Sequence, residues 1–246
     1  MHIASRARRR PLAATAVVIA MVAATFITRS QHAGAATAMS EGVLCDTNAQ
    51  QTFSLTAGDG YVSTPDGNSL YTWSYSNSSR SFQLPGPTLC VTSGQPVTVI
   101  LHNTLPEATS IVFPGQAGVK ANGNPAQPQF DSGGSLTSLV QPAAANTGSV
   151  TYTFTAGTPG TYLYESGSDV NKQVQMGLYG ALIVRPANLA AGVSQVNNRT
   201  DSAYSPTHEY LFLLSEVDPD LHLAVERHQP YDYSQFRARY FMINGR

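Results

Sequence analysis

The chain has 246 residues, which is enough for one or two domains. Only 12% of the residues are charged and the formal net charge is −1, so the sequence lacks the basic surface that nucleic-acid binding requires. Together with 20 Gly and 15 Pro residues, this profile favours an extracellular fold rich in β-strands.

The N-terminus has the features of an export signal. Arginines at positions 6 and 8–10 precede an uncharged apolar stretch, residues 11–27, and Ala-x-Ala patterns follow at residues 33–38. A basic start, an apolar middle and a small-residue ending are typical of a secretory signal peptide. We therefore expect residues 1–38 to be a signal peptide and the protein to be secreted or held in the cell envelope. The alternative is an uncleaved membrane leader, although the apolar run is shorter than the roughly 20 residues of a spanning helix.

The mature region contains two cysteines, Cys45 and Cys90. Because oxidising compartments allow thiols to pair, export predicts a disulfide between them. In the chain-entropy model a loop of this length stabilises the fold by roughly 4 kcal/mol. The alternatives are two buried free thiols or a metal role, and no histidine lies at ligand spacing from either cysteine.

Strand patterns recur along the chain at short intervals. Polar and apolar residues alternate at 52–57, 71–75 and 149–155, as half-buried strands require. The sequence TPDGN at 64–68 predicts a turn, because Pro fixes φ and Gly accepts positive φ. Residues 117–148 predict a long solvated loop, or a binding element, with one strand at 135–141. No long helical period occurs outside the leader, so we expect an all-β sandwich or barrel.

Two segments resemble the first plastocyanin-like (cupredoxin) domain of multicopper oxidases. Residues 160–186 read GTYLYESGSDVNKQVQMGLYGALIVRP, where that family has Gly-Thr-aromatic-aromatic-Tyr-His-Ser-His followed by Gly-Leu-Tyr-Gly-Ala-Leu-Ile-Val. Residues 85–99 are similar to the family's Pro-Gly-Pro element and its next strand, and residues 110–115 to its Ser-Ile-His-Trp-His-Gly motif. The resemblance implies a Greek-key β-sandwich or barrel of cupredoxin type.

The resemblance also implies copper as the cofactor of the family, but the ligands differ here. A His-x-His pair sends two imidazoles to one side of a strand, and two such strands hold the type 2 and type 3 copper ions of the family. In this chain the four positions are Val112, Pro114, Glu165 and Gly167. Three have no side-chain donor, and a lone carboxylate is poorly matched to copper. We expect no copper at these positions and no catalytic residue in this chain.

The other candidate ligands are isolated in the sequence. A lone histidine is more often a surface or hydrogen-bonded residue than a metal ligand, and this applies to His102, His208, His222 and His228. Met176 offers a thioether but lacks the Cys and His partners of a blue-copper site. We therefore expect Met176 to fill the core.

The C-terminal part resembles the opening of the second cupredoxin domain of the same family. We expect the first domain to span residues 39–190, and residues 191–246 to form a linker and the first strands of an incomplete second domain. A buried strand is predicted at 209–217, and the YFMINGR sequence at 240–246 predicts the start of another. Since a few strands cannot bury a core of their own, this segment packs on the first domain, awaits a partner or reflects a truncated reading frame.

Three functions are compatible with these observations. The chain is an exported, multicopper-oxidase-like N-terminal piece of a copper oxidoreductase, with further ligands in missing downstream cupredoxin domains, or a copper-free scaffold that binds protein or envelope partners. A third possibility is another enzyme that uses Glu165 and Asp169 as acid and base, but carboxylates in a turn are usually solvated. We expect no turnover by this chain alone, an unknown protein partner, no nucleic acid, and membrane contact only through an uncleaved leader.

Overall fold

The two longest strands contain the alternating segments at 52–57 and 71–75. The computed structural model describes residues 45–77, 82–187, 194–195, 203–204 and 209–246. Strand β1 spans Thr52–Ser63 and β2 spans Ser69–Asn77, and the predicted turn at 64–68 joins them. They pair in antiparallel register, from Leu55 opposite Asn77 to Ser63 opposite Ser69.

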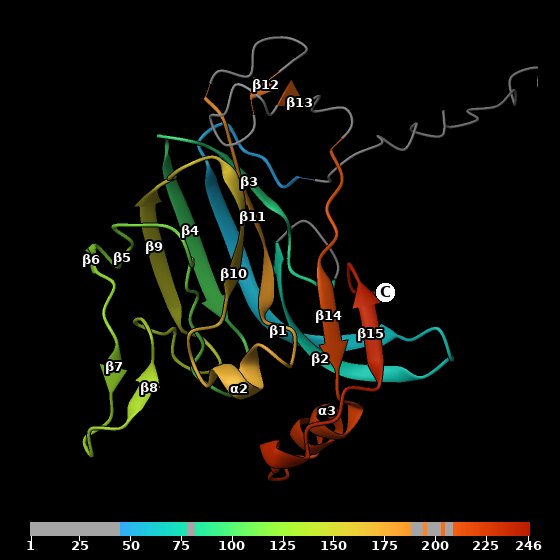
Figure 1. The fold of residues 1–246 in the computed structure, drawn as a ribbon. Helices are drawn as coiled ribbons and strands as arrows, with labels where there is room; N and C mark the ends of the chain where they lie inside the picture. Colours follow the sequence, from blue (N-terminus) through green and yellow to red (C-terminus); the bar gives the residue numbers. More distant parts are fainter. Residues whose placement is uncertain (1–44, 78–81, 188–193, 196–202, 205–208) are drawn as a thin grey trace, which may run out of the picture. The chain divides into compact units, whose positions relative to one another are not determined.

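Two sheets form the body of this part of the chain (Figure 1). The larger sheet has the order β2-β1-β4-β9-β5-β6, in which β1 and β4 run parallel. Its further strands are β4 (Pro96–Asn103), β5 (Lys120–Ala121), β6 (Asn124–Pro125) and β9 (Ser149–Thr155). The smaller sheet has the order β10-β11-β3, with β3 at Leu89–Thr92, β10 at Gly160–Glu165 and β11 at Tyr179–Arg185.

The two sheets share one hydrophobic core, as a β-sandwich requires. Inward-facing residues of both sheets belong to a single buried cluster, which includes Phe53, Leu55, Val99, Leu101, Tyr152, Phe154, Leu89, Val91, Leu182 and Val184. Met176 is also fully buried in this cluster, which confirms that it fills the core. The prediction of an all-β sandwich is therefore confirmed, while the Greek-key connection stays a prediction.

Short elements connect these strands. The segment 117–148 contains β5, β6, β7 (Gln129–Phe130) and β8 (Leu136–Ser138), so the expectation of a single strand at 135–141 was too simple. Between β10 and β11 the chain forms a four-residue helix, α2 (Val170–Gln173), which the sequence did not predict. Strands β12 (Ser194–Gln195) and β13 (Ala203–Tyr204) pair with each other.

The predicted disulfide is present on the outer face of the smaller sheet. Cys45 and Cys90 are joined, and their Cα atoms lie 5.4 Å apart. Cys90 packs with Ala181 and Ile183 of β11, and Leu211 covers the same cluster. Both faces of β11 are thus covered, which explains why that strand is buried along almost its whole length.

The C-terminal segment differs from its prediction. We expected a buried strand at 209–217, but β14 covers only Leu214–Val217 and pairs with β15 (Tyr240–Ile243) alone. One face of this two-stranded ladder packs, since Val217 and Met242 contact Leu70 of β2. On the other face, no cover is found among the described residues, and Leu214, Phe241 and Ile243 are exposed, as are Tyr210 and Phe212 just before β14.

An unpredicted helix, α3 (Pro219–Glu226), fixes the C-terminal segment to β2. Asp218 caps it by accepting a hydrogen bond from the Asp220 amide. Leu221 is fully buried in the main core, and α3 lies beside β2 (Figure 1). A short 3-10 helix, η3 (Tyr233–Gln235), follows before β15. The described C-terminal residues therefore pack on the β-sandwich, as one of the three alternatives proposed.

Several expectations concern residues outside the described part of the chain. These are the signal peptide at 1–38, most of the linker between 187 and 206, and His208. Glu41–Arg246 form one compact unit, and the division into domains at residue 190 stays a prediction. Among the described residues, no helix has the length and apolar character needed to cross a membrane.

We predict that shortening Leu221 weakens the packing of α3 on the core and lowers the stability of the chain. Leu221→Ala should lower the free energy of unfolding by about 2 to 5 kcal/mol, because it leaves a cavity in the main core. Leu223 is 39% exposed on the same helix, so Leu223→Ala should change stability by less than about 1 kcal/mol. Urea denaturation measures both, and equal effects would contradict the docking of α3.

A second prediction concerns the pH dependence of this docking. One ring nitrogen of His222 lies 2.5 Å from the Tyr71 carbonyl oxygen and the other 3.2 Å from that of Gln175. Burial lowers the pKa of His222, although these carbonyl groups oppose the shift. In the unfolded chain His222 takes up a proton as the pH falls below about 6.5, whereas in the folded chain it does so at a lower pH. The free energy of unfolding therefore decreases as the pH falls from about 6.5 to the pKa of the folded state.

The measurement is urea denaturation between about pH 7 and pH 5. The wild-type chain should lose stability over this interval more steeply than His222→Gln, which has no ionisable side chain at this position. Parallel pH profiles for the two proteins would show that His222 does not contribute.

Candidate functional site

The two segments that the resemblance assigns to copper binding lie side by side. Val112 and Glu165 form an isolated antiparallel bridge, in which the Val112 amide donates to the Glu165 carbonyl at 2.8 Å. The return bond, from the Glu165 amide to the Val112 carbonyl, measures 3.2 Å. Directly opposed residues of an antiparallel pair place their side chains on the same face. The side chains of Val112 and Glu165 therefore point to the same side, as ligands of a shared metal ion would.

The other two positions, Gly167 and Pro114, provide no metal ligand. A Cβ atom added to Gly167 would lie 2.7 Å from Cγ1 of Val112 and 3.1 Å from Oγ of Ser110. Contacts below 3.0 Å essentially never occur for real Cβ atoms, so a histidine at 167 would require the Val112 side chain to shift. Pro114, on the other segment, has no donor atom. These four residues do not fit a copper ion.

A pocket occupies the face on which these side chains converge. It has a volume of about 580 Å³ and is lined by residues 111–116, 118–119, 125–127, 139–140 and Glu165. Three of the four assigned positions, Val112, Pro114 and Glu165, are therefore on its wall. Of its lining residues, all within the described ranges, only Glu165 is ionisable.

Glu165 is held at the wall by the end of β10. Its side chain is half-buried, and desolvation raises the pKa of its carboxyl group. Elsewhere in the lining, the Gln116 side chain accepts a hydrogen bond from the Gly157 amide at 2.9 Å through Oε1. That bond orients the Gln116 amide group. The pocket therefore combines apolar side chains with one partly desolvated carboxyl group.

A triangle of serine hydroxyls lies under this wall. Ser110 Oγ is 3.0 Å from both Ser138 Oγ and Ser168 Oγ, and these two are 2.9 Å apart. All three residues are buried. Each hydroxyl has one donor and two acceptor sites, so a ring of three can satisfy all its members. Sequence reasoning missed this cluster because its serines come from three separate segments.

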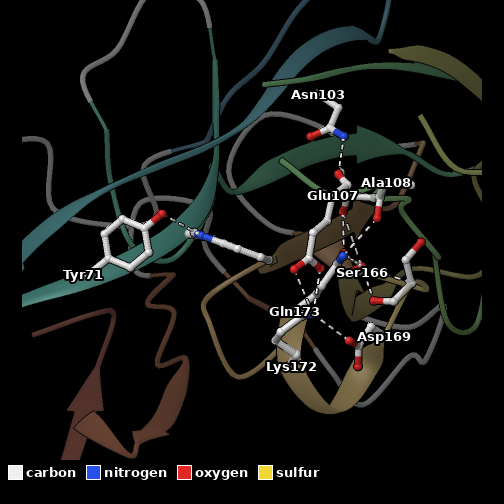
Figure 2. A network of polar contacts seen from close by, with 11 residues as sticks. Tyr71, Asn103, Glu107, Ala108, Ser166, Asp169, Lys172 and Gln173 are labelled. Atoms are coloured by element: carbon white, nitrogen blue, oxygen red, sulfur yellow. Dashed lines mark hydrogen bonds and ion pairs between the residues drawn. The ribbon is translucent and has the colours of Figure 1, made fainter. Parts of the chain in front are cut away.

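A second polar network holds α2 in place (Figure 2). The Gln173 side chain accepts hydrogen bonds from Thr109 and Ser166, both at 2.7 Å, and donates to the Ala108 carbonyl at 3.0 Å. Lys172 Nζ lies 2.7 Å from a Glu107 carboxylate oxygen and 2.9 Å from one of Asp169.

These contacts bear on the acid–base hypothesis for Glu165 and Asp169. Asp169 is engaged with Lys172, and no contact found in the described residues joins it to Glu165. The two carboxyl groups therefore work in different surroundings, one in an ion pair and one in the pocket.

The remaining candidate ligands are dispersed. His102 is exposed near the end of β4, His222 is a buried, hydrogen-bonded residue of α3, and His228 is exposed beyond that helix. Within the described ranges, no group of three or more His, Cys, Asp or Glu side chains is placed to hold a metal ion.

Comparisons with known proteins agree with the architecture. A family model described as multicopper oxidase matches residues 64–189, more than half of the chain. The fold is similar to that of a multicopper oxidase designated mgLAC, with 20% identity and a TM-score of 0.56 over 79% of this chain and 53% of that chain. No curated protein sequence matches the chain.

Two solved structures from Nitrosomonas europaea are also similar. A blue copper oxidase has 21% identity and a TM-score of 0.56, over 79% of this chain and 53% of that one. A copper nitrite reductase has 22% identity and a TM-score of 0.51, over 79% and 56%. At these identities the similarity shows the fold alone, which confirms the cupredoxin type. The chain spans about half the length of each structure.

We predict that the crowding at Gly167 depends on Val112. Gly167→Ala should destabilise the chain by about 1 to 3 kcal/mol, because the added methyl group overpacks against the Val112 side chain. In the double variant with Val112→Ala the penalty for the methyl group should be smaller, since the opposing atom is gone. A double-mutant cycle by urea denaturation measures this coupling, and additive effects would contradict it.

Proposed function

The chain belongs to the multicopper oxidase family, and we propose that it is an exported member whose first-domain ligand positions do not hold copper. We propose further that this chain does not oxidise substrates by itself. Copper binding and oxidation remain activities of the family as a whole.

The observation that carries this proposal is the packing at the four ligand positions. Val112 and Pro114 supply no donor atom, and a side chain at 167 would collide with Val112. The side-chain donor that remains is the carboxylate of Glu165, whereas copper sites in proteins favour imidazole and sulfur ligands. The converging geometry persists, but the chemistry that would use it has been replaced by apolar contacts.

Export is supported by the disulfide and by the N-terminal sequence. Cys45 and Cys90 are joined, which is typical of proteins in oxidising compartments. A basic, then apolar, then small-residue leader is the pattern of a secretory signal peptide. We infer that the mature protein acts outside the cytoplasm, either secreted or in the cell envelope.

The uncovered face of the β14–β15 ladder supports a protein partner. Leu214 lies opposite Ile243 in the ladder, and both are exposed, together with Phe212 and Phe241 at 72% and 76%. Exposed apolar patches of this kind mark interaction sites. The partner would be downstream cupredoxin domains that carry the remaining copper ligands. The alternative is a different protein bound by a copper-free scaffold.

The proposal predicts that the purified chain retains only background copper. The chain is incubated with Cu(II) in air and desalted, and its bound copper is measured by elemental analysis alongside oxygen consumption with a phenolic substrate. Stoichiometric copper or sustained oxygen uptake would contradict the proposal.

A gain-of-binding variant provides the matched control. Val112→His combined with Pro114→His restores one His-x-His pair on the face that Glu165 shares. This variant should retain more copper than the wild-type chain, because two imidazoles then converge with a carboxylate. Equal, background copper in both proteins would show that the four positions no longer converge as the structure indicates.

A further inference from the structure

The pocket beside Glu165 has walls that are fixed by backbone hydrogen bonds from several segments. Val112 and Glu165 bond to each other, and the Leu139 amide donates to the Gly167 carbonyl at 2.8 Å. On the far side the Ala126 amide donates to the Val119 carbonyl at 2.9 Å. The pocket is therefore part of the folded framework. Its volume of about 580 Å³ falls in the range of small-molecule sites, roughly 300 to 1,000 Å³.

The lining is mostly apolar and carries a single carboxyl group. Val112, Val119, Leu139 and Val140 present aliphatic side chains, and Glu165 is the ionisable residue among them. Within the described residues its carboxyl group has no hydrogen bond or ion pair, and desolvation is the cause of its raised pKa. An unpaired carboxylate beside apolar surface is an unfavourable arrangement that an opposite charge would relieve.

We propose that this pocket binds a small organic ammonium ion with an apolar body, and that Glu165 is its counter-ion. The apolar part of the ligand would lie against Val112 and Leu139, and its ammonium group would reach the carboxylate at the end of β10. The inference rests on the proposed function in one respect, namely that copper does not occupy these positions. It goes beyond that function by assigning a ligand class to them.

Other classes of ligand suit the pocket less well. An anion would be repelled by Glu165, and a neutral molecule would desolvate the carboxylate further without pairing it. A hard metal ion needs several oxygen ligands, but Glu165 is the one carboxylate on the wall. An organic cation with an apolar body matches both the charge and the lining.

The test compares two probes of nearly equal size. The metal-free chain is titrated calorimetrically with 2-phenylethylammonium chloride and with 2-phenylethanol, its neutral analogue. Pairing a charge in the pocket predicts that the ammonium ion binds about ten-fold more tightly or better. Methyl resonances of Val112 and Leu139 should shift on titration, which locates the bound ion.

Two variants identify the carboxylate. Glu165→Gln keeps the size of the side chain but removes the charge, and should abolish the preference for the ammonium ion. Glu216→Gln, on the exposed face of β14, should leave it unchanged. Binding without charge preference, an unchanged preference in Glu165→Gln, or no binding of either probe would overturn the proposal.

Further measurements separate the possible causes of failure. Thermal unfolding of Glu165→Gln checks that the variant folds, and should it not, the comparison of the two probes on the wild-type chain still decides. Copper content is measured on the same preparations before chelation. Copper in the untreated chain would refute the proposed function, whereas loss of charge-selective binding in the metal-free chain would refute the ligand assignment alone.

Discussion

The backbone pairing between Val112 and Glu165 is the constraint on which the rest of the site depends. It joins the end of β10 to the segment 110–116 through two main-chain hydrogen bonds, and neither bond involves a side chain. The side chains at these positions can therefore change without loss of the pairing. This explains how the framework of a copper-binding family persists here with valine, proline, glutamate and glycine at the ligand positions.

Buried polar contacts hold that framework from beneath. The serine triangle joins the segment 110–116, the end of β8 and the turn after β10, and the Tyr75 hydroxyl donates to the Ser110 carbonyl at 2.7 Å. Buried hydroxyls are costly unless they are paired, so the triangle is stable only while these segments remain together. The three hydroxyls thus join the segment 110–116 to the turn after β10, the two segments on which the family resemblance places metal ligands.

The sequence was informative where a local pattern decides the structure. Alternation located β1, β2 and β9, and the single pair of cysteines located the disulfide. It was not informative where the outcome depends on distant contacts. Helix α3 is too short to show a clear period, and Leu221 is buried only because β2 passes beside it.

The same limit explains the error at residues 209–217. An apolar run predicts a buried strand when sheets cover both faces, but in the part of the chain that the structure describes β14 has a single partner strand and one covered face. The environment of Glu165 is another case of this kind. The motif resemblance assigned this position to a copper ligand, whereas its partial burial in a pocket depends on segments that are distant in the sequence. Where the family resemblance would place histidines, this chain therefore has a carboxyl group beside apolar surface. That combination favours a cationic, partly apolar ligand over a return to copper.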